Sequence, residues 1–148
     1  MAKKNKIFLG LVLLLVFLSF PKQLAPGSLF NDCENYLINK IRCQAGVNPV
    51  ALNLDLNQSA LAKATLLESG EIQWGEHAHD GFSNLIRNFN NNFVWFGEDL
   101  ARNFNTEEEV YAAWVNSPKH YEIMTDPKAK YFGYACANQY CVLHLAKD

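Results

Sequence analysis

Apolar residues recur every three or four positions over the first part of the chain, a spacing that predicts amphipathic helices. A first helix is predicted over residues 32–45, where Gly46 supplies the stop, and a second over 55–69, closed by Gly70. A shorter helix is predicted over 82–89. Helices therefore dominate the region before residue 90.

The pattern changes toward the C-terminus. Residues 106–109 read Thr-Glu-Glu-Glu, a capping box that opens a further helix. Segment 93–100 fits a short strand or an extended buried stretch, and 131–136 and 141–145 read as the two strands of a hairpin. Helices followed by late strands predict an α+β fold, in which helices pack on a small antiparallel sheet.

Residues 1–26 differ from the rest of the chain. Three lysines precede fourteen residues, 7–20, that are almost entirely apolar. A membrane-spanning helix needs about 17–25 apolar residues, whereas the core of a signal peptide needs about 7–15. We therefore expect a signal peptide, with an uncleaved N-terminal anchor as the alternative, and an extracytoplasmic domain over 27–148.

Composition is that of one globular domain, with 148 residues of which 49% are hydrophobic. Four of the 13 basic residues fall in 1–26, so the remainder carries nine against 15 acidic residues, a net charge of −6. A nucleic-acid partner is not expected of such an acidic domain.

All four cysteines, Cys33, Cys43, Cys136 and Cys141, lie in the part expected to be exported. An oxidising compartment favours disulfides, and four cysteines allow three pairings. We prefer Cys33–Cys43 with Cys136–Cys141, because both bridges are local. Four buried free thiols are the alternative.

Three titratable side chains stand out as candidates for chemistry: His79, Glu98 and His120. Two imidazoles and one carboxylate make a set that can bind zinc, with water in the fourth position. The same groups can serve as a general base and its helpers in hydrolysis. His77 lies two residues from His79, so one interpretation is that it completes a three-histidine site; exposure to solvent is the simpler interpretation, and we prefer it. His144 alternates with leucines along its strand, so it is expected to point toward solvent without a role.

The order of four motifs resembles that of the CAP superfamily, which comprises cysteine-rich secretory proteins, antigen 5 and pathogenesis-related proteins. Bacterial forms read N-x-x-R, H-D-G-F, G-E-N-L-A and W-x-x-S-P-G-H. The corresponding segments here are residues 39–42, 79–82, 97–101 and 114–120. Asp99 replaces an asparagine in the third motif, and Lys119 replaces a glycine in the fourth. The resemblance covers about residues 32–146.

This resemblance implies an α-β-α sandwich, with a small antiparallel sheet between helical layers. It also implies a cleft lined by a His–Glu–Glu–His tetrad, which binds a divalent cation in some members. His79, Glu98 and His120 carry over as three of the four residues, whereas the position of the second glutamate is Ser117. We therefore expect zinc or another divalent cation as a cofactor only if these three side chains are enough to bind it. Ser117 is instead expected to cap the turn that holds His120.

Three functions follow from these residues. We favour an exported, monomeric, non-catalytic module that binds a small molecule, a lipid or a protein, because the missing glutamate weakens the case for catalysis. The alternative is a metal-dependent hydrolase, peptidase-like, with Glu98 as base. A buried network of His79, Glu98 and His120 that only fixes loops is the third. Trp95, Phe96 and Trp114 are expected in the core, and membrane contact is expected only through residues 7–20.

Overall fold

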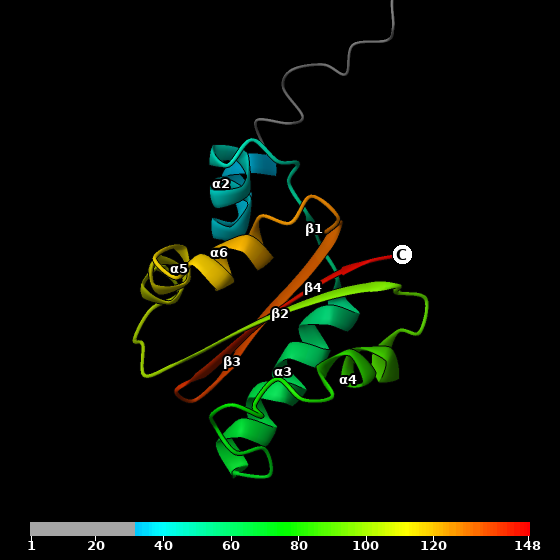
Figure 1. Cartoon of the computed structure of the whole chain (residues 1–148), viewed down its shortest axis with the longest axis vertical. Helices are drawn as coiled ribbons and strands as arrows, with labels where there is room; N and C mark the ends of the chain where they lie inside the picture. The colour runs from blue at the N-terminus through cyan, green and yellow to red at the C-terminus, as the bar shows by residue number, and fades with distance from the viewer. Residues whose placement is uncertain (1–31) are drawn as a thin grey trace, which may run out of the picture.

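The computed structural model describes residues 32–148 (Figure 1). The predicted export segment, 1–26, lies outside these residues. The helices and strands are α2 (Leu37–Gln44), β1 (Ala51–Leu52), α3 (Leu54–Ser69), α4 (Phe82–Phe89), β2 (Trp95–Arg102), α5 (Glu107–Val115), α6 (Pro118–Met124), β3 (Tyr131–Ala137) and β4 (Tyr140–Lys147).

Local capping determines where α3 and α5 begin and end. The side chain of Asn53 accepts a hydrogen bond from the backbone N–H of Leu56 at 3.0 Å, and α3 ends at Gly70, whose φ is +79°. Thr106 Oγ1 accepts from Glu109 N at 3.2 Å, which confirms the predicted cap of α5. The return bond from the Glu109 carboxylate goes to the N–H of Asn105, one residue before the cap.

Three features depart from the predicted elements. The first helix is interrupted at Tyr36, whose backbone is extended and whose ring packs edge-on against Phe132, with 5.0 Å between ring centroids. The short strand β1 was not predicted. Neither was α6, in which Pro118 occupies the first helical position, where a missing N–H costs nothing.

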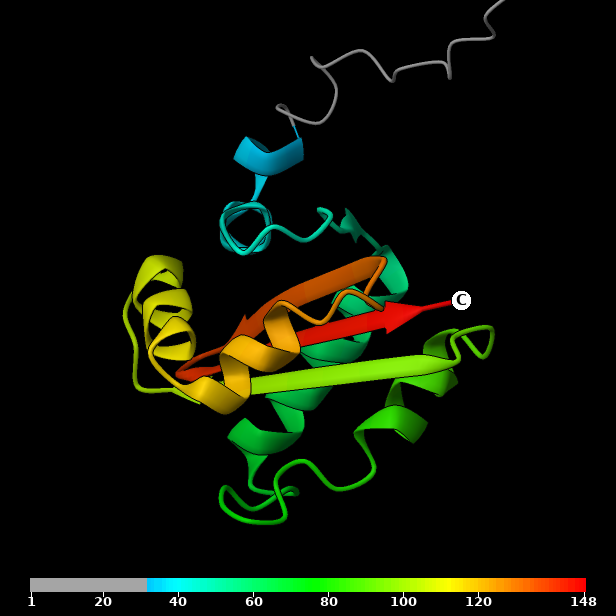
Figure 2. The ribbon, with the colours of Figure 1, turned by 45° about the horizontal axis from the view of Figure 1, so that its top comes forward.

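The sheet has the strand order β1-β3-β4-β2. The β2–β4 and β3–β4 pairs are antiparallel, as predicted, but β1 pairs with β3 in parallel, so the sheet is mixed. α3 and α4 cover one face, while α2, α5 and α6 lie on the other (Figure 2). The fold is therefore the expected α+β sandwich with a sheet between two helical layers.

Both faces of the sheet are buried, so its strands carry core residues on each side. The helix α3 lies so close to β3 that a Cβ on Gly133 would meet the backbone of Leu56 and Asn57 at 2.2 Å. Glycine at this position permits the approach. The middle of the sheet is consequently inaccessible to water from either side.

The Asn39–Arg42 motif has a structural role. Arg42 is fully buried and donates hydrogen bonds to the carbonyl groups of Asn48, Met124 and Asp126. Two of these carbonyls lie at the end of α6. The buried guanidinium thus holds α2 against the helix that carries His120.

Both preferred disulfides are present. Cys33 is bonded to Cys43 and Cys136 to Cys141, with Cα–Cα distances of 6.0 Å and 4.1 Å. The second bridge joins β3 to β4 next to their turn. Within residues 32–148, no helix combines the length and apolar character that a membrane crossing requires.

Candidate functional site

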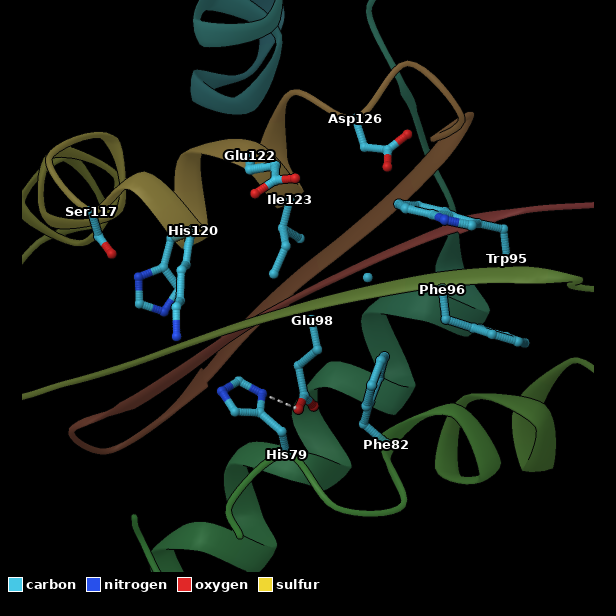
Figure 3. Close-up of a pocket in the computed structure, with 12 residues that line it drawn as sticks. His79, Phe82, Trp95, Phe96, Glu98, Ser117, His120, Glu122, Ile123 and Asp126 are labelled. Atoms are coloured by element: carbon cyan, nitrogen blue, oxygen red, sulfur yellow. Dashed lines mark hydrogen bonds and ion pairs between the residues drawn. The ribbon is translucent and has the colours of Figure 1, made fainter. Parts of the chain in front are cut away.

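A cleft of about 460 Å³ opens along the strand β2 (Figure 3). His79, Phe82 and Glu98 lie on one side of the strand, and His120 and Ile123 of α6 lie on the other. Its lining residues are His79, Phe82, Trp95, Phe96, Gly97, Glu98, Ser117, Lys119, His120, Glu122, Ile123 and Asp126. All three predicted candidates therefore line one cleft.

Glu98 is the centre of a hydrogen-bond network at the floor of the cleft. Its Oε1 lies 2.9 Å from His79 Nδ1, and its Oε2 lies 2.9 Å from His144 Nε2. The Glu98 residue is only 2% exposed, whereas the His79 side chain is 44% exposed. The network thus runs from the interior to the cleft surface and ends at His79.

Strand register explains the contact between Glu98 and His144. The two residues are direct cross-strand partners on β2 and β4. Asn103 N donates to Gln139 O at 3.0 Å, which places the odd-numbered residues of β2 in hydrogen-bonded pairs with β4, so Glu98 and His144 form a non-hydrogen-bonded pair. Side chains of such pairs lie closer together, which favours their contact.

α3 supplies the inner end of the network. Ser59 Oγ lies 2.8 Å from His144 Nδ1, and Lys63 Nζ lies 3.7 Å from Glu98 Oε1. Ser59 and Lys63 are one helical turn apart, so they share a face of the helix. Both are fully buried beneath the sheet. The buried ammonium gives the Glu98 carboxylate a compensating charge.

Glu98 is held as an anion. Burial alone raises its pKa, but the hydrogen bonds from His144 and His79, with the nearby charge of Lys63, outweigh burial and lower the pKa below its ordinary value. Burial also lowers the pKa of His144, against the raising effect of Glu98. A neutral His144 donates its Nε2–H to Glu98, and its unprotonated Nδ1 lies 2.8 Å from Ser59 Oγ, whose hydroxyl also lies 2.9 Å from the Leu56 carbonyl oxygen.

His120 stands on the opposite wall, on α6. Burial, followed by the charge of His79, lowers the pKa of His120, so the ring is neutral at pH 7. Its Nδ1 is buried without a hydrogen-bond partner among residues 32–148. The Trp114 ring lies 6.5 Å from the imidazole, centroid to centroid, in a tilted arrangement.

The donors do not form a ready metal site. Within the described part of the chain, no group of three His, Cys, Asp or Glu side chains is arranged to hold one metal ion. Both oxygens of Glu98 accept hydrogen bonds from imidazoles, and the residue is only 2% exposed. Glu98 contacts Nδ1 of His79 and leaves its Nε2 toward the cleft, so Glu98 has the place of an outer carboxylate that orients a histidine rather than of a metal ligand itself.

Several expectations about single residues were wrong. His144 does not face solvent: it is 0% exposed, because the helical layers cover both faces of β4. Ser117 occupies the position before α6, but its side chain caps nothing. Trp114 is core as expected, whereas Trp95 and Phe96 are partly buried, pack against the core and also line the cleft. His77, in contrast, is exposed as expected and contacts Asp80 at 3.1 Å.

Asp99 is a second buried acid that sequence reasoning did not single out for chemistry. Next to Glu98 in β2, it points to the opposite face of the sheet. It is 0% exposed, and neither carboxylate oxygen has a hydrogen-bond partner within residues 32–148. Burial, with the charge of Glu98 added, raises the pKa of Asp99 to about 8. At pH 7 Asp99 is therefore largely protonated.

Two solved structures share this arrangement of elements. An extracellular protein of Bacillus anthracis str. Ames that contains an SCP domain superposes with a TM-score of 0.70 at 14% identity, covering 88% of this chain and 45% of that one. An outer surface protein of Borrelia burgdorferi gives 0.62 at 22% identity, covering 74% of this chain and 86% of that one. At these identities the likeness establishes the fold.

Sequence comparison gives the family. The uncharacterized protein YkwD of Bacillus subtilis (strain 168) is 26% identical over 100 residues, which are 66% of this chain but only 38% of YkwD. The chain thus spans well under half of that relative. Residues 36–144 match the model of the cysteine-rich secretory protein family, CAP. This match covers most of the chain and agrees with the sandwich fold and the cleft at His79 and Glu98. The chain therefore belongs to the CAP family.

Proposed function

We propose that this chain is an exported binding module whose cleft holds a ligand without converting it. The carrying observation is that Glu98 is only 2% exposed and that each of its oxygens accepts a hydrogen bond from an imidazole. A general base needs an accessible oxygen and a pKa near the working pH, whereas the pKa of Glu98 is lowered. Glu98 is suited to orient His79, not to remove a proton.

The walls of the cleft supply the means of binding. The neutral imidazole of His120 and the outward Nε2 of His79 offer polar contacts on opposite sides. Phe82, Trp95 and Phe96 offer apolar surface. A few convergent polar groups on a largely apolar wall are typical of ligand sites of this size.

Export is supported by three observations. Residues 1–26 have the pattern of a signal peptide or an N-terminal anchor. The similar structures include an extracellular protein and an outer surface protein. The disulfides Cys33–Cys43 and Cys136–Cys141 are consistent with an oxidising compartment.

The test is a small-fragment screen by NMR on the purified full chain, labelled with ¹⁵N. We expect fragments that shift the amide of Gly97, and we expect these shifts to be lost in His79→Ala and His120→Ala. His77→Ala is the matched control, because His77 is exposed outside the cleft. Absence of any fragment that depends on both imidazoles would refute the binding cleft.

A zinc chloride titration by calorimetry, with a casein hydrolysis assay beside it, tests the hydrolase alternative. We expect no stoichiometric zinc site and no turnover. One-to-one zinc binding that is abolished by His79→Ala, Glu98→Ala and His120→Ala, with zinc-dependent hydrolysis, would overturn the non-catalytic assignment.

A further inference from the structure

Besides its neutral imidazole, the cleft is lined by four charged side chains: Glu98, Lys119, Glu122 and Asp126. Glu98 is compensated from the interior, because its carboxylate lies 3.7 Å from the buried ammonium of Lys63. Both of its oxygens also accept hydrogen bonds from imidazoles. A ligand in the cleft therefore meets a charge that the protein has already balanced.

Asp126 is compensated in a similar way. Its Oδ1 accepts a hydrogen bond from the backbone N–H of Lys128 at 2.8 Å. Arg42 donates to the backbone carbonyl of Asp126 at 3.1 Å, so the buried guanidinium lies beside this residue. Burial lowers the pKa of Arg42, and the charge of Asp126 opposes that effect. The Asp126 carboxylate thus serves as the counterion of a buried cation.

The charges of Lys119 and Glu122 are not compensated within residues 32–148. Both side chains are exposed, and neither forms an ion pair with another of these residues. They are three residues apart on α6, so they share a face of the helix and are separated by about 4.5 Å along its axis. A ligand that satisfies both carries one positive and one negative charge, and is neutral overall.

The order of residues along α6 gives this ligand a direction. Glu122 lies on the Trp95 side of His120 (Figure 3). Lys119 precedes His120 in the helix and lines the same cleft, at the end where the imidazole of His79 stands on the opposite wall. The cation of the ligand therefore belongs beside Glu122 and Trp95, and its anion belongs beside Lys119.

Trp95 determines which kind of cation fits. Its ring lies close to Ile123, since a Cβ on Gly97 would meet the two side chains at 3.2 Å and 3.1 Å. Among the described side chains no cation covers the Trp95 ring, whereas the guanidinium of Arg87 already lies 4.5 Å from the centre of the Phe96 ring. A quaternary ammonium is attracted to such an aromatic face and has no N–H to satisfy. A primary ammonium would need acceptors for three donors, which this apolar wall lacks.

Lys119 determines which kind of anion fits. It stands where the bacterial CAP motif has a glycine, so the cation is a feature of this chain rather than of the motif. A phosphodiester carries a single negative charge shared by two oxygens, which matches one ammonium. In a choline phosphodiester a short ethylene bridge joins this anion to a quaternary ammonium, which suits two side chains on one face of a helix.

We propose that the cleft binds a choline phosphodiester, with its quaternary ammonium between Trp95 and Glu122 and its phosphate beside Lys119. This proposal rests on the binding role proposed above and names the class of ligand. A choline phosphodiester occurs both as a soluble glycerol diester and as the headgroup of a lipid, and the experiment distinguishes these two sources.

The experiment titrates glycerophosphocholine into the purified full chain, labelled with ¹⁵N, and follows binding by NMR. We expect saturable shifts of the Trp95 indole N–H and of the Gly97 amide, and binding about tenfold weaker in Trp95→Leu. Glycerophosphoethanolamine has the same net charge but a primary ammonium, and we expect it to bind about fivefold more weakly. Absence of binding by glycerophosphocholine, or equal binding by the two diesters, would overturn the proposal.

Glu122→Gln and Lys119→Gln form a matched pair, because each keeps a polar side chain and removes one charge. We expect each to weaken glycerophosphocholine about threefold at low salt. Choline chloride should be weakened only by Glu122→Gln, and dimethyl phosphate only by Lys119→Gln. Glu108→Gln and Lys128→Gln change exposed charges outside the cleft and should alter neither. If both cleft variants weakened choline and dimethyl phosphate alike, the two-ended site would be wrong.

The fragment screen keeps this proposal distinct from the binding role of the cleft. If fragments that depend on His79 and His120 bind while glycerophosphocholine does not, the cleft binds ligands but the choline phosphodiester is wrong. Sedimentation with phosphatidylcholine vesicles separates the two sources. Vesicle binding that is reduced both by Glu122→Gln and by excess glycerophosphocholine would support a lipid headgroup. Binding of glycerophosphocholine without such vesicle binding would support the soluble diester.

Discussion

Replacing Asp99 with asparagine is expected to stabilise the protein at neutral pH and to change how its stability depends on pH. In the folded protein the pKa of Asp99 is about 8, against an ordinary value of 3.8. The folded state therefore holds a proton that the unfolded state releases. Because the unfolded state binds fewer protons, the contribution of this group is fully present below pH 3.8 and is lost as pH rises to about 8.

The magnitude follows from the two pKa values of Asp99. Each pH unit between them costs the folded state about 1.4 kcal/mol. At pH 7, which is 3.2 units above the ordinary value of 3.8, the accumulated penalty is about 4 kcal/mol. Asparagine has nearly the same shape and does not ionise, so Asp99→Asn avoids the penalty. Between pH 5 and pH 7 its advantage over the natural chain should grow by about 3 kcal/mol.

Urea unfolding of the full chain at pH 5, 6 and 7, with both disulfides intact, measures this difference. All other titrating groups are common to the two proteins, so their contributions cancel. Asp80→Asn is the matched control: its side chain is 74% exposed, and its effect should stay within about 0.5 kcal/mol at every pH. A constant difference between Asp99→Asn and the natural chain from pH 5 to pH 7 would refute the reasoning.

Four further substitutions test the packing, the helix cap and the network, all by urea unfolding. Gly133→Ala places a Cβ 2.2 Å from the backbone of Leu56, so we expect it to lower the free energy of unfolding by about 3 kcal/mol or to prevent folding. Gly97→Ala is the comparison: its Cβ meets only side chains, at 3.1 Å and beyond, and we expect a loss of about 1 kcal/mol. Thr106→Ala removes the cap of α5 and should cost about 1 kcal/mol; no loss would mean that the cap contributes nothing. His144→Ala removes the hydrogen-bond donor of Glu98 Oε2, so we expect the free energy of unfolding to fall by about 3 kcal/mol. An unchanged urea midpoint would contradict the proposed role of the network in stability.

Local features of this chain were predictable from its sequence. The cap at Thr106, the end of α3 at Gly70 and the bridge between Cys136 and Cys141 each depend on residues a few positions apart. Such features need no knowledge of the tertiary structure. The membership of His79 and Glu98 in one cleft came instead from the resemblance to a family, since nineteen residues separate them.

The inner half of the site was missed because it depends on the layers of the fold. Alternation along β4 correctly places His144 on the opposite face of the sheet from Leu143 and Leu145. The expected exposure of His144 to solvent was wrong, because a second helical layer covers that face. One signal was available in α3. Its buried stripe is Leu56, Ser59, Ala60, Lys63, Ala64 and Leu67, in which two polar residues interrupt an apolar face. A buried lysine in such a stripe indicates a buried acid as its partner.

The support of Glu98 from α3 and β4 has a consequence for how such a cleft can diversify. The carboxylate is positioned by side chains of the interior, Ser59, Lys63 and His144, which do not line the cleft. The outer walls, formed by segment 71–81 and α6, do not hold it there, apart from His79. Descendants of one ancestral domain can therefore exchange loop and helix surfaces, and with them their preferred ligands, while inheriting the same anionic floor unchanged. Grafting new walls onto this scaffold is a practical design route for the same reason.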